Sequence, residues 1–398
     1  MTNELAIFGG KQTISRTFKK YNPIGIKEIK KATEVLNSGI LSNFVGSWGS
    51  QFYGGIKVHQ LEKKVCEYYG VKYAISVNSW TSGLICAIGA LDIEPGDEII
   101  LSPFTMSACS SAILHWNAIP VFVDVEDETF NIDPKLIEEK ITKKTKAILA
   151  IDIFGHPCDF DSINKIAHNY NLKVITDSAQ APCSKYKNKI GGTLSDIGGF
   201  SLNYHKHIHT GEGGIIVTNN EEYYNRMTLI RNHGESVLEK MGRSDLNNMI
   251  GFNFRLGEIE SAIAIEQLKK LDKLVKKKQF ICHSLNDGLK DLKGLITPIT
   301  KQYATHSFYC YALKLDLNII KVNRQKILDA LDAEGIQGIS GGYVNLHLLP
   351  MFKNKVAYGK ANFPWSLTKN GRDMKYEMGL CPNSELLHKE SLILFQVC

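Results

Sequence analysis

The stretch "YAISVNSWTSGLICAIGALDIEPGDEIILSP" (Tyr73–Pro103) decides the fold class. Its first five residues form a short apolar run, which predicts a strand, and residues 81–93 carry apolar side chains at helical spacing. A Pro-Gly turn then leads into a second apolar run that stops at Pro103. Strand, helix and strand in this order are typical of two parallel strands joined by a crossover helix.

The same alternation continues along the chain and predicts the architecture. We expect an α/β fold with a mostly parallel central sheet and helices on both faces. The later segments of this pattern are a helix in "TMSACSSAILHWN", strands in "IPVFVDV" and "KAILAIDIFG", a helix in "DFDSINKIAHNYN", and strands in "LKVITDSAQ", "GGFSLN" and "GEGGIIVTNN".

The pattern changes after Asn253. Residues 255–292 predict one long amphipathic helical stretch, and "HSFYCYALKL" and "NRQKILDALDAEG" predict a strand and a helix of a smaller α+β domain. We therefore expect three parts: an N-terminal arm (1–22), a large α/β domain (23–275) and a small C-terminal domain (276–398).

Composition excludes several classes of protein. No apolar run approaches the roughly 20 residues that span a bilayer, and the N-terminus lacks a basic segment followed by a long apolar core. The net charge is +6 in 398 residues, and no basic stretch is interleaved with base-stacking aromatics. We expect a cytoplasmic protein that binds neither membrane nor nucleic acid, with its nine cysteines reduced.

The stretch "SLNYHKHIHTGEGGIIV" (Ser201–Val217) admits two kinds of chemistry. His205, His207 and His209 alternate and would share one face of an extended segment, as a metal site needs. Zinc requires three or four converging ligands, and no HxxxH or CxxC spacing supplies a fourth. We therefore expect ordinary loop histidines, no metal, and a reactive Lys206 in a loop at the sheet edge.

A lysine amine is a nucleophile when deprotonated, and a carbonyl cofactor can capture it as a Schiff base. Pyridoxal phosphate also needs a carboxylate beside its ring nitrogen and donors for its phosphate at a helix N-terminus. Asp177 ends a predicted strand, and "NSWTSG" opens a predicted helix directly after another. Ligands of parallel sheets bind at the carboxyl ends of the strands. Each feature alone is ordinary, since such an Asp is often structural and such a Ser-Thr pair is usually a helix cap.

Together with further motifs, these segments give a family resemblance. The chain resembles the DegT/DnrJ/StrS family of pyridoxal-phosphate-dependent sugar aminotransferases, which have the aspartate aminotransferase fold (fold type I). The motifs that carry the resemblance lie between Ser38 and Leu271: "LSNFVGSWGSQ", "SVNSWTSGL", "PVFVDVEDETFNIDP", "TKAILAIDIFGHPCD", "LKVITDSAQAP", "SDIGGFSLNYHKHIHTGEGGIIVTNN", "LIRNHGE" and "GFNFRLGEIESAIAIEQLKKL".

The resemblance implies a role for each matching residue. Lys206 would bind the cofactor covalently and carry protons during the reaction, Asp177 would pair with the ring nitrogen, and Gln180 would lie beside the phenolic oxygen. Met106 stands where many relatives place an aromatic side chain over the ring. The implied phosphate ligands are Ser201, the turn of Trp80 and Thr81, and Asn253, which the family supplies from the neighbouring subunit. Many relatives have glycine at the position of Trp80, where a backbone amide can still serve.

The resemblance also implies the reaction. L-glutamate would donate an amino group, leaving pyridoxamine phosphate, and a keto sugar or related phosphorylated ketone or aldehyde would accept it, in cell-surface polysaccharide or sugar biosynthesis. The active unit would be a homodimer with shared sites, and the small domain would be shortened at "SLILFQVC". Two alternatives stay open: a keto-sugar dehydratase, a branch of the family with histidine in place of the lysine, and a non-catalytic protein that binds pyridoxal phosphate.

Overall fold

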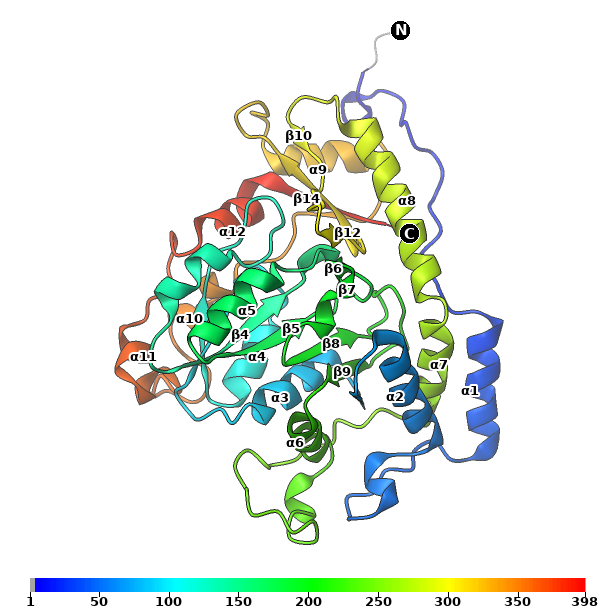
Figure 1. Cartoon of the computed structure of the whole chain (residues 1–398). Helices are drawn as coiled ribbons and strands as arrows, with labels where there is room; N and C mark the ends of the chain where they lie inside the picture. The colour runs from blue at the N-terminus through cyan, green and yellow to red at the C-terminus, as the bar shows by residue number, and fades with distance from the viewer. Residues whose placement is uncertain (1–3, 398) are drawn as a thin grey trace.

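The computed structural model describes residues 4–397 and is built on a central sheet of seven strands in the order β1-β9-β8-β5-β4-β2-β3 (Figure 1). Strand β9 (Gly214–Thr218) runs antiparallel to its neighbours β1 (Tyr73–Val77) and β8 (Ile197–Ser201), and the remaining pairs are parallel. The predicted α/β class with a mostly parallel sheet is confirmed.

The other elements have the following bounds. The remaining strands are β2 (Glu98–Leu101), β3 (Ile119–Phe122), β4 (Thr145–Ile151), β5 (Lys173–Asp177), β6 (Lys185–Tyr186), β7 (Lys189–Ile190), β10 (Leu295–Ile296), β11 (Ala304–Thr305), β12 (Cys310–Leu315), β13 (Ile339–Ser340) and β14 (Leu392–Gln396). The α-helices are α1 (Ile26–Ser38), α2 (Ile56–Tyr69), α3 (Trp80–Ala90), α4 (Ala108–His115), α5 (Phe160–Asn169), α6 (Glu221–Arg231), α7 (Glu258–Leu268), α8 (Leu271–Leu289), α9 (Arg324–Ala333), α10 (Pro350–Lys353), α11 (Lys369–Asp373) and α12 (Pro382–Leu386). None of the helices in the described part of the chain has the length and apolar character needed to cross a membrane.

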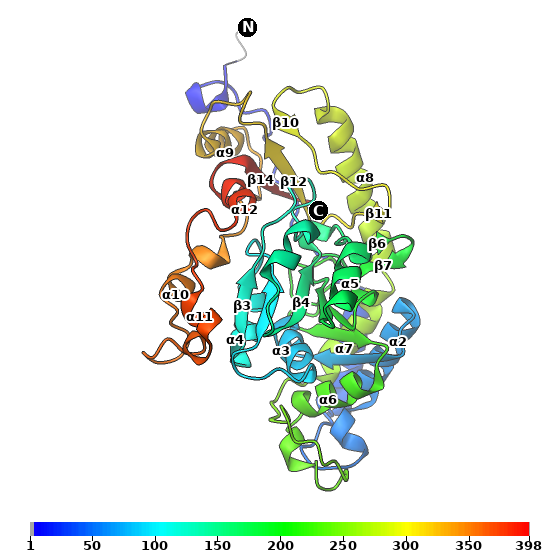
Figure 2. The same cartoon turned by 60° about the vertical axis from the view of Figure 1, so that its left-hand side comes forward.

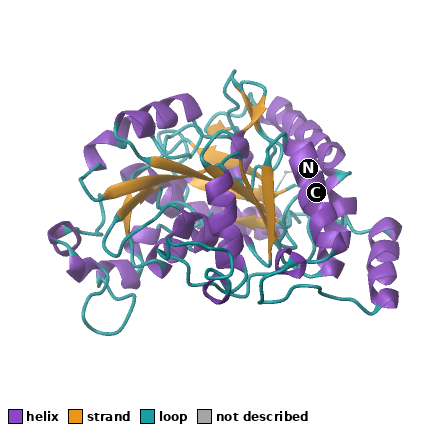
Figure 3. Cartoon of the chain, turned by 60° about the horizontal axis from the view of Figure 1, so that its bottom comes forward, coloured by secondary structure: helices purple, strands orange, loops and turns teal. Residues whose placement is uncertain are grey.

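Helices cover both faces of the sheet (Figure 3). Successive side chains of a strand point to opposite faces, and β4 shows the consequence: Ala147, Leu149 and Ile151 pack with α3 and α4, whereas Ile148 and Ala150 pack with α5. Helices α2 and α7 cover the latter face near β8 and β9. Burial on both faces explains why these strands read as continuous apolar runs.

The C-terminal part forms a second, antiparallel sheet in the order β10-β12-β14-β13. Between β13 and β14 the chain returns to the central sheet, so that α10 and α11 lie beside its β3 edge (Figure 2). The Tyr376 hydroxyl donates to the Pro120 carbonyl at 2.7 Å, and the Tyr376 ring packs edge-on against Phe122. The division of the chain at residues 22 and 275 stays a prediction.

The stretch predicted as one long helix is divided. Helix α7 ends at Leu268 and α8 starts at Leu271. At the break, the Lys270 ammonium donates to the Pro23 carbonyl at 2.9 Å and pairs with Glu28 of α1 at 2.5 Å. These partners are more than two hundred residues away in sequence, so local periodicity could not reveal the break.

Candidate active site

Asp177 is the last residue of β5, at the carboxyl end of the central sheet. Its side chain is 6% exposed and lies on the face that α3 and α4 cover, because Ile175, two residues earlier, packs there. The Ala179 backbone N–H donates to Oδ1 at 3.0 Å, and the Cys109 thiol of α4 donates to Oδ2 at 3.2 Å. Burial raises the pKa of this carboxyl, whereas the two donors and the nearby Lys206 ammonium oppose the rise.

Lys206 lies in the loop that leaves the end of β8 and is 9% exposed. Burial lowers its pKa to about 8, although the Asp177 carboxylate favours the charged form. The ammonium nitrogen sits over the ring of Tyr309, 4.5 Å from the centroid. A lysine with this pKa is partly neutral near physiological pH, which is the state that attacks an aldehyde.

Gln180 joins the two parts of the molecule beside this pair. Its Oε1 accepts from the Phe154 backbone N–H at 2.7 Å, and its Nε2 donates to the Tyr343 hydroxyl at 2.9 Å. Tyr343 belongs to the C-terminal stretch "GGYVNLHLLPMFKNKVAYG", which the sequence predicts to edge the pocket. Sequence reasoning did not single out Tyr309, whose only local signal is its position directly before an apolar strand.

The start of α3 suits a phosphate. Ser79 caps the helix by accepting from the Ser82 N–H at 3.1 Å, which leaves the N–H groups of Trp80 and Thr81 without intrahelical partners. Gly214 keeps the approach open, because a Cβ on it would lie 2.7 Å from the Trp80 nitrogen. Thr81 is exposed and Ser201 is half-buried. Free amides at a helix N-terminus are a ready anion site.

Two of the predicted site residues lie outside this buried group. Met106 is 56% exposed. Asn253 is exposed, its Oδ1 accepts from Arg255 Nε at 2.7 Å, and its carbonyl accepts from Asn78 Nδ2 at 3.4 Å. Their roles toward the cofactor stay predictions.

The three alternating histidines do not converge. His207 is buried and its Nε2 pairs with the Ser307 carbonyl oxygen at 2.9 Å, and burial lowers its pKa to about 3. His205 is exposed and His209 is half-buried. Among residues 4–397, no group of three or more His, Cys, Asp or Glu side chains could hold a metal ion.

Comparison with known proteins accounts for this arrangement. The sequence model of the DegT/DnrJ/EryC1/StrS aminotransferase family matches residues 27–378. The chain belongs to this family. It is 33% identical to the spore coat polysaccharide biosynthesis protein SpsC of Bacillus subtilis, over 86% of each protein. It is also 33% identical to the GDP-perosamine synthase of Caulobacter vibrioides, over 74% of this chain and 78% of that protein.

Solved structures of DegT/DnrJ/EryC1/StrS proteins have the same fold as this chain. An aminotransferase from Psychrobacter cryohalolentis superimposes with a TM-score of 0.81 at 28% identity, covering 96% of this chain and 94% of the other. The GDP-4-keto-6-deoxy-D-mannose-3-dehydratase of E. coli, solved with hydrated pyridoxal phosphate, gives 0.77 at 26% identity, covering 95% and 94%.

This member of the family is a pyridoxal-phosphate-dependent aminotransferase. When bound, the cofactor supplies the electron sink that lets an amino group move between two carbon skeletons. The residues described above fit it: a buried carboxylate for the ring nitrogen, a lysine with a lowered pKa for the aldehyde, and free amides at the start of α3 for the phosphate.

Proposed function

We propose that this enzyme transfers the amino group of L-glutamate to the keto group of a sugar linked to phosphate or diphosphate, with Lys206 and Asp177 as its catalytic residues. The observation that carries the proposal is the buried pair itself: a lysine with a pKa of about 8 in the loop after β8 interacts electrostatically with the carboxylate that ends the neighbouring parallel strand β5. Opposite charges with burial-shifted pKa values are typical of catalytic sites.

Each residue then has a definite task. The Asp177 carboxylate keeps a proton on the ring nitrogen, and the Lys206 amine takes a proton from one carbon and returns it to another. Gln180, fixed by Phe154 and Tyr343, orients the ring through its phenolic oxygen. Ser201, Thr81 and the Trp80 amide would hold the phosphate, and Met106 would pack over the ring.

The dehydratase alternative is less well supported, although the E. coli dehydratase is a structural neighbour. In that branch, as the family resemblance implies, a histidine stands in place of the lysine. Here Lys206 is the side chain whose charge interacts with Asp177, whereas His207 is directed to the Ser307 carbonyl. This difference favours amino transfer.

The names of the relatives support a sugar acceptor. Two similar proteins are named for spore coat polysaccharide and GDP-perosamine synthesis. We therefore propose an acceptor that carries phosphate groups, used in cell-surface polysaccharide synthesis. The cytoplasmic location expected from the sequence stays a prediction.

We further propose a homodimer with shared sites, in which Asn253 of one subunit reaches the cofactor phosphate of the other. Exposed apolar side chains at one end of the chain support a contact with a second copy, because such a contact would remove their surface from water. They lie on α1 and in the segment that follows it: Ile26, Ile29, Leu36, Ile40, Leu41 and Trp48.

The colour of the purified protein tests the proposal. The protein should be yellow, and adding L-glutamate should bleach it, because the amino group moves onto the cofactor. Lys206→Ala should abolish turnover, while His205→Ala, the matched control from the same loop, should keep the colour. A screen of keto acceptors against glutamate-treated protein then identifies the substrate, and better amination of neutral free sugars than of any phosphate-bearing ketone would contradict the proposed acceptor.

A further inference from the structure

The indole of Trp80 is buried, and its N–H group is an exception among the buried tryptophans. Its side chain is 5% exposed, and Nε1 has no well-formed hydrogen bond to any described residue. The other two buried tryptophans are satisfied, since Trp116 Nε1 donates to the Ile85 carbonyl at 2.7 Å and Trp365 Nε1 to the Tyr376 hydroxyl at 2.8 Å. Burying an N–H without a hydrogen-bond partner costs folding free energy. The groups that lie near this N–H therefore indicate what it is for.

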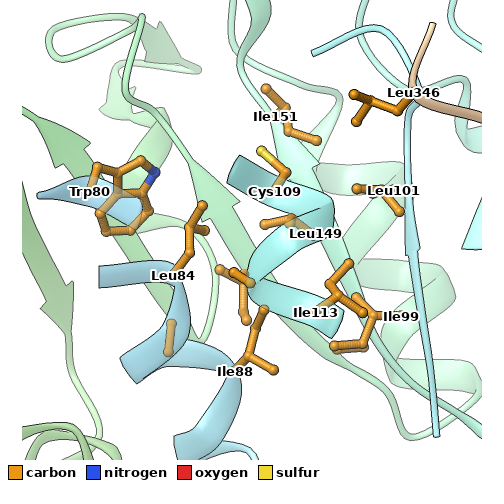
Figure 4. Packing of buried hydrophobic residues seen from close by; sticks show 14 of the residues in the cluster. Trp80, Leu84, Ile88, Ile99, Leu101, Cys109, Ile113, Leu149, Ile151 and Leu346 are labelled. Atoms are coloured by element: carbon orange, nitrogen blue, oxygen red, sulfur yellow. The ribbon is translucent and has the colours of Figure 1, made fainter. Parts of the chain in front are cut away.

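The indole lies close enough to Asp177 to act on its carboxyl. Although the two groups do not form a well-aligned hydrogen bond, the indole N–H is among the groups that lower the pKa of this carboxyl. Figure 4 shows the nitrogen-bearing edge of Trp80 turned toward the side of the core where Cys109 lies. Cys109 is the residue whose thiol donates to Asp177 Oδ2.

The packing around the indole explains how it reaches this place. Gly199 on β8 is the direct cross-strand partner of Asp177 on β5. A Cβ on Gly199 would lie 1.9 Å from Cζ3 of Trp80, and a Cβ on Gly83 would lie 2.6 Å from its Cε3. The indole therefore occupies the space that a side chain at position 199 would fill, directly beside the carboxylate.

We propose that Trp80 is a positioning residue for Asp177: its indole N–H, together with the Cys109 thiol, holds the carboxylate in place as an anion for its role toward the ring nitrogen of the cofactor. This goes beyond phosphate binding by the Trp80 backbone amide, and it rests on the proposed role of Asp177.

The proposal makes stability depend on pH in a defined direction. The pKa of Asp177 is raised in the folded protein. The stability linked to this carboxyl is therefore fully present below its unfolded pKa of roughly 4, and it is lost as the pH rises through its folded pKa. Removing a donor raises the folded pKa further and enlarges this loss. Asp177 also faces the titratable groups of Lys206, Cys109, Asp152 and Tyr343. All four stay in place in the variants whose melting temperatures are compared.

The test compares four forms of the full chain freed of cofactor: wild type, Trp80→Phe, Asp177→Asn and the double variant. Phe keeps most of the ring and loses only the N–H donor. We expect Trp80→Phe to lower the melting temperature more at about pH 8 than at about pH 4.5. The pH-dependent part should vanish in the Asp177→Asn background, because asparagine does not titrate. A melting temperature of Trp80→Phe equal to or above that of wild type at both pH values would overturn the proposal. It would show that the indole N–H makes no stabilising interaction, since removing an unpartnered N–H costs nothing.

Cofactor binding gives a second readout. Hydrogen bonds to charged groups are among the strong ones, so Trp80→Phe should weaken pyridoxal phosphate binding about tenfold. Trp116→Phe is the matched control: it should destabilise equally at both pH values and leave cofactor affinity unchanged. Cys109→Ser, which supplies a stronger hydroxyl donor, should restore part of the affinity when combined with Trp80→Phe. An unchanged cofactor affinity in Trp80→Phe would also overturn the proposal.

The two proposals can fail separately. The coupling between Trp80 and Asp177 is measured without cofactor and without turnover, so it stands or falls regardless of the reaction. If the coupling is present but Asp177→Asn retains activity, the proposed function fails while the contact between the two residues is upheld.

Discussion

Lys206 and Asp177 are both buried, and burial disfavours the charged form of each side chain. Burial lowers the pKa of the amine to about 8 and raises that of the carboxyl, so each group moves toward its neutral form. Each charge partly offsets the cost of the other. The Lys206 amine is therefore ready to gain or lose a proton near neutral pH.

The first prediction concerns the reactivity of Lys206. Because only the neutral amine attacks an aldehyde, the rate at which the cofactor-free protein takes up pyridoxal phosphate should rise with pH, with a midpoint near pH 8, and level off at higher pH. Stopped-flow absorbance across this range measures the rate. A rate that does not change with pH, or a midpoint near the ordinary lysine value of about 10.4, would contradict the lowered pKa.

The second prediction concerns Asp177→Asn. The carboxylate matters most when negative charge develops during the reaction, so the substitution should reduce kcat much more than it weakens cofactor binding. Electrostatic losses of this kind are worth roughly 3–4 kcal/mol elsewhere, so we expect a rate loss of about a hundredfold or more. Kinetics with glutamate measure it, and a rate within about threefold of wild type would leave Asp177 only a structural role.

At the scale of elements, helix α3 links the fold to the site, because its first turn both caps the helix and faces the candidate phosphate position. The third prediction uses this overlap. Asp is as good an N-cap as Ser, so Ser79→Asp should fold at least as stably as wild type, whereas Ser79→Ala should lose about 1 kcal/mol.

The new carboxylate should nevertheless repel a phosphate. Ser79→Asp should therefore weaken pyridoxal phosphate binding at least about tenfold, by like-charge repulsion at the helix N-terminus, and leave the binding of phosphate-free pyridoxal unchanged. Titration with the two compounds separates the effects. Equal losses for both would show that the phosphate does not bind at α3.

Elements that depend on local pattern were predictable from the sequence, and those that depend on distant contacts were not. The strands around Asp177 and Lys206 follow from apolar runs. The break between α7 and α8 and the return of Tyr376 to the β3 edge depend on residues far away in the chain. Likewise, the motifs pointed to Asp177 and Trp80 separately, but only the pairing of β5 with β8 brings the indole beside the carboxylate.

At the scale of the whole molecule, the subunit to which Asn253 belongs decides whether the two active sites are shared. Within one chain, Asn253 contacts Asn78, which directly precedes the helix α3 turn. The proposal of shared sites instead assigns Asn253 to the partner subunit. The two assignments differ in what a mixed dimer can do.

The fourth prediction follows from this difference. Lys206→Ala and Asn253→Ala should each be inactive, and mixing them with subunit exchange should restore activity. A hybrid dimer with shared sites has one site with both defects and one with neither, so random pairing returns at most about a quarter of wild-type activity. If Asn253 serves its own chain, every site keeps one defect and no activity returns. Sedimentation must accompany the mixing, because a fully active monomer would exclude shared sites.

The close packing of Trp80 on Gly199 also constrains how this enzyme could have diverged from its relatives. With the indole in place, any side chain at position 199 would collide with it, since its Cβ would lie 1.9 Å from Cζ3. A mutational path must therefore make position 199 a glycine before the tryptophan arrives, and must lose the tryptophan before that glycine can be replaced. The two sites are thus expected to show sign epistasis, in which the order of mutations decides whether an intermediate survives.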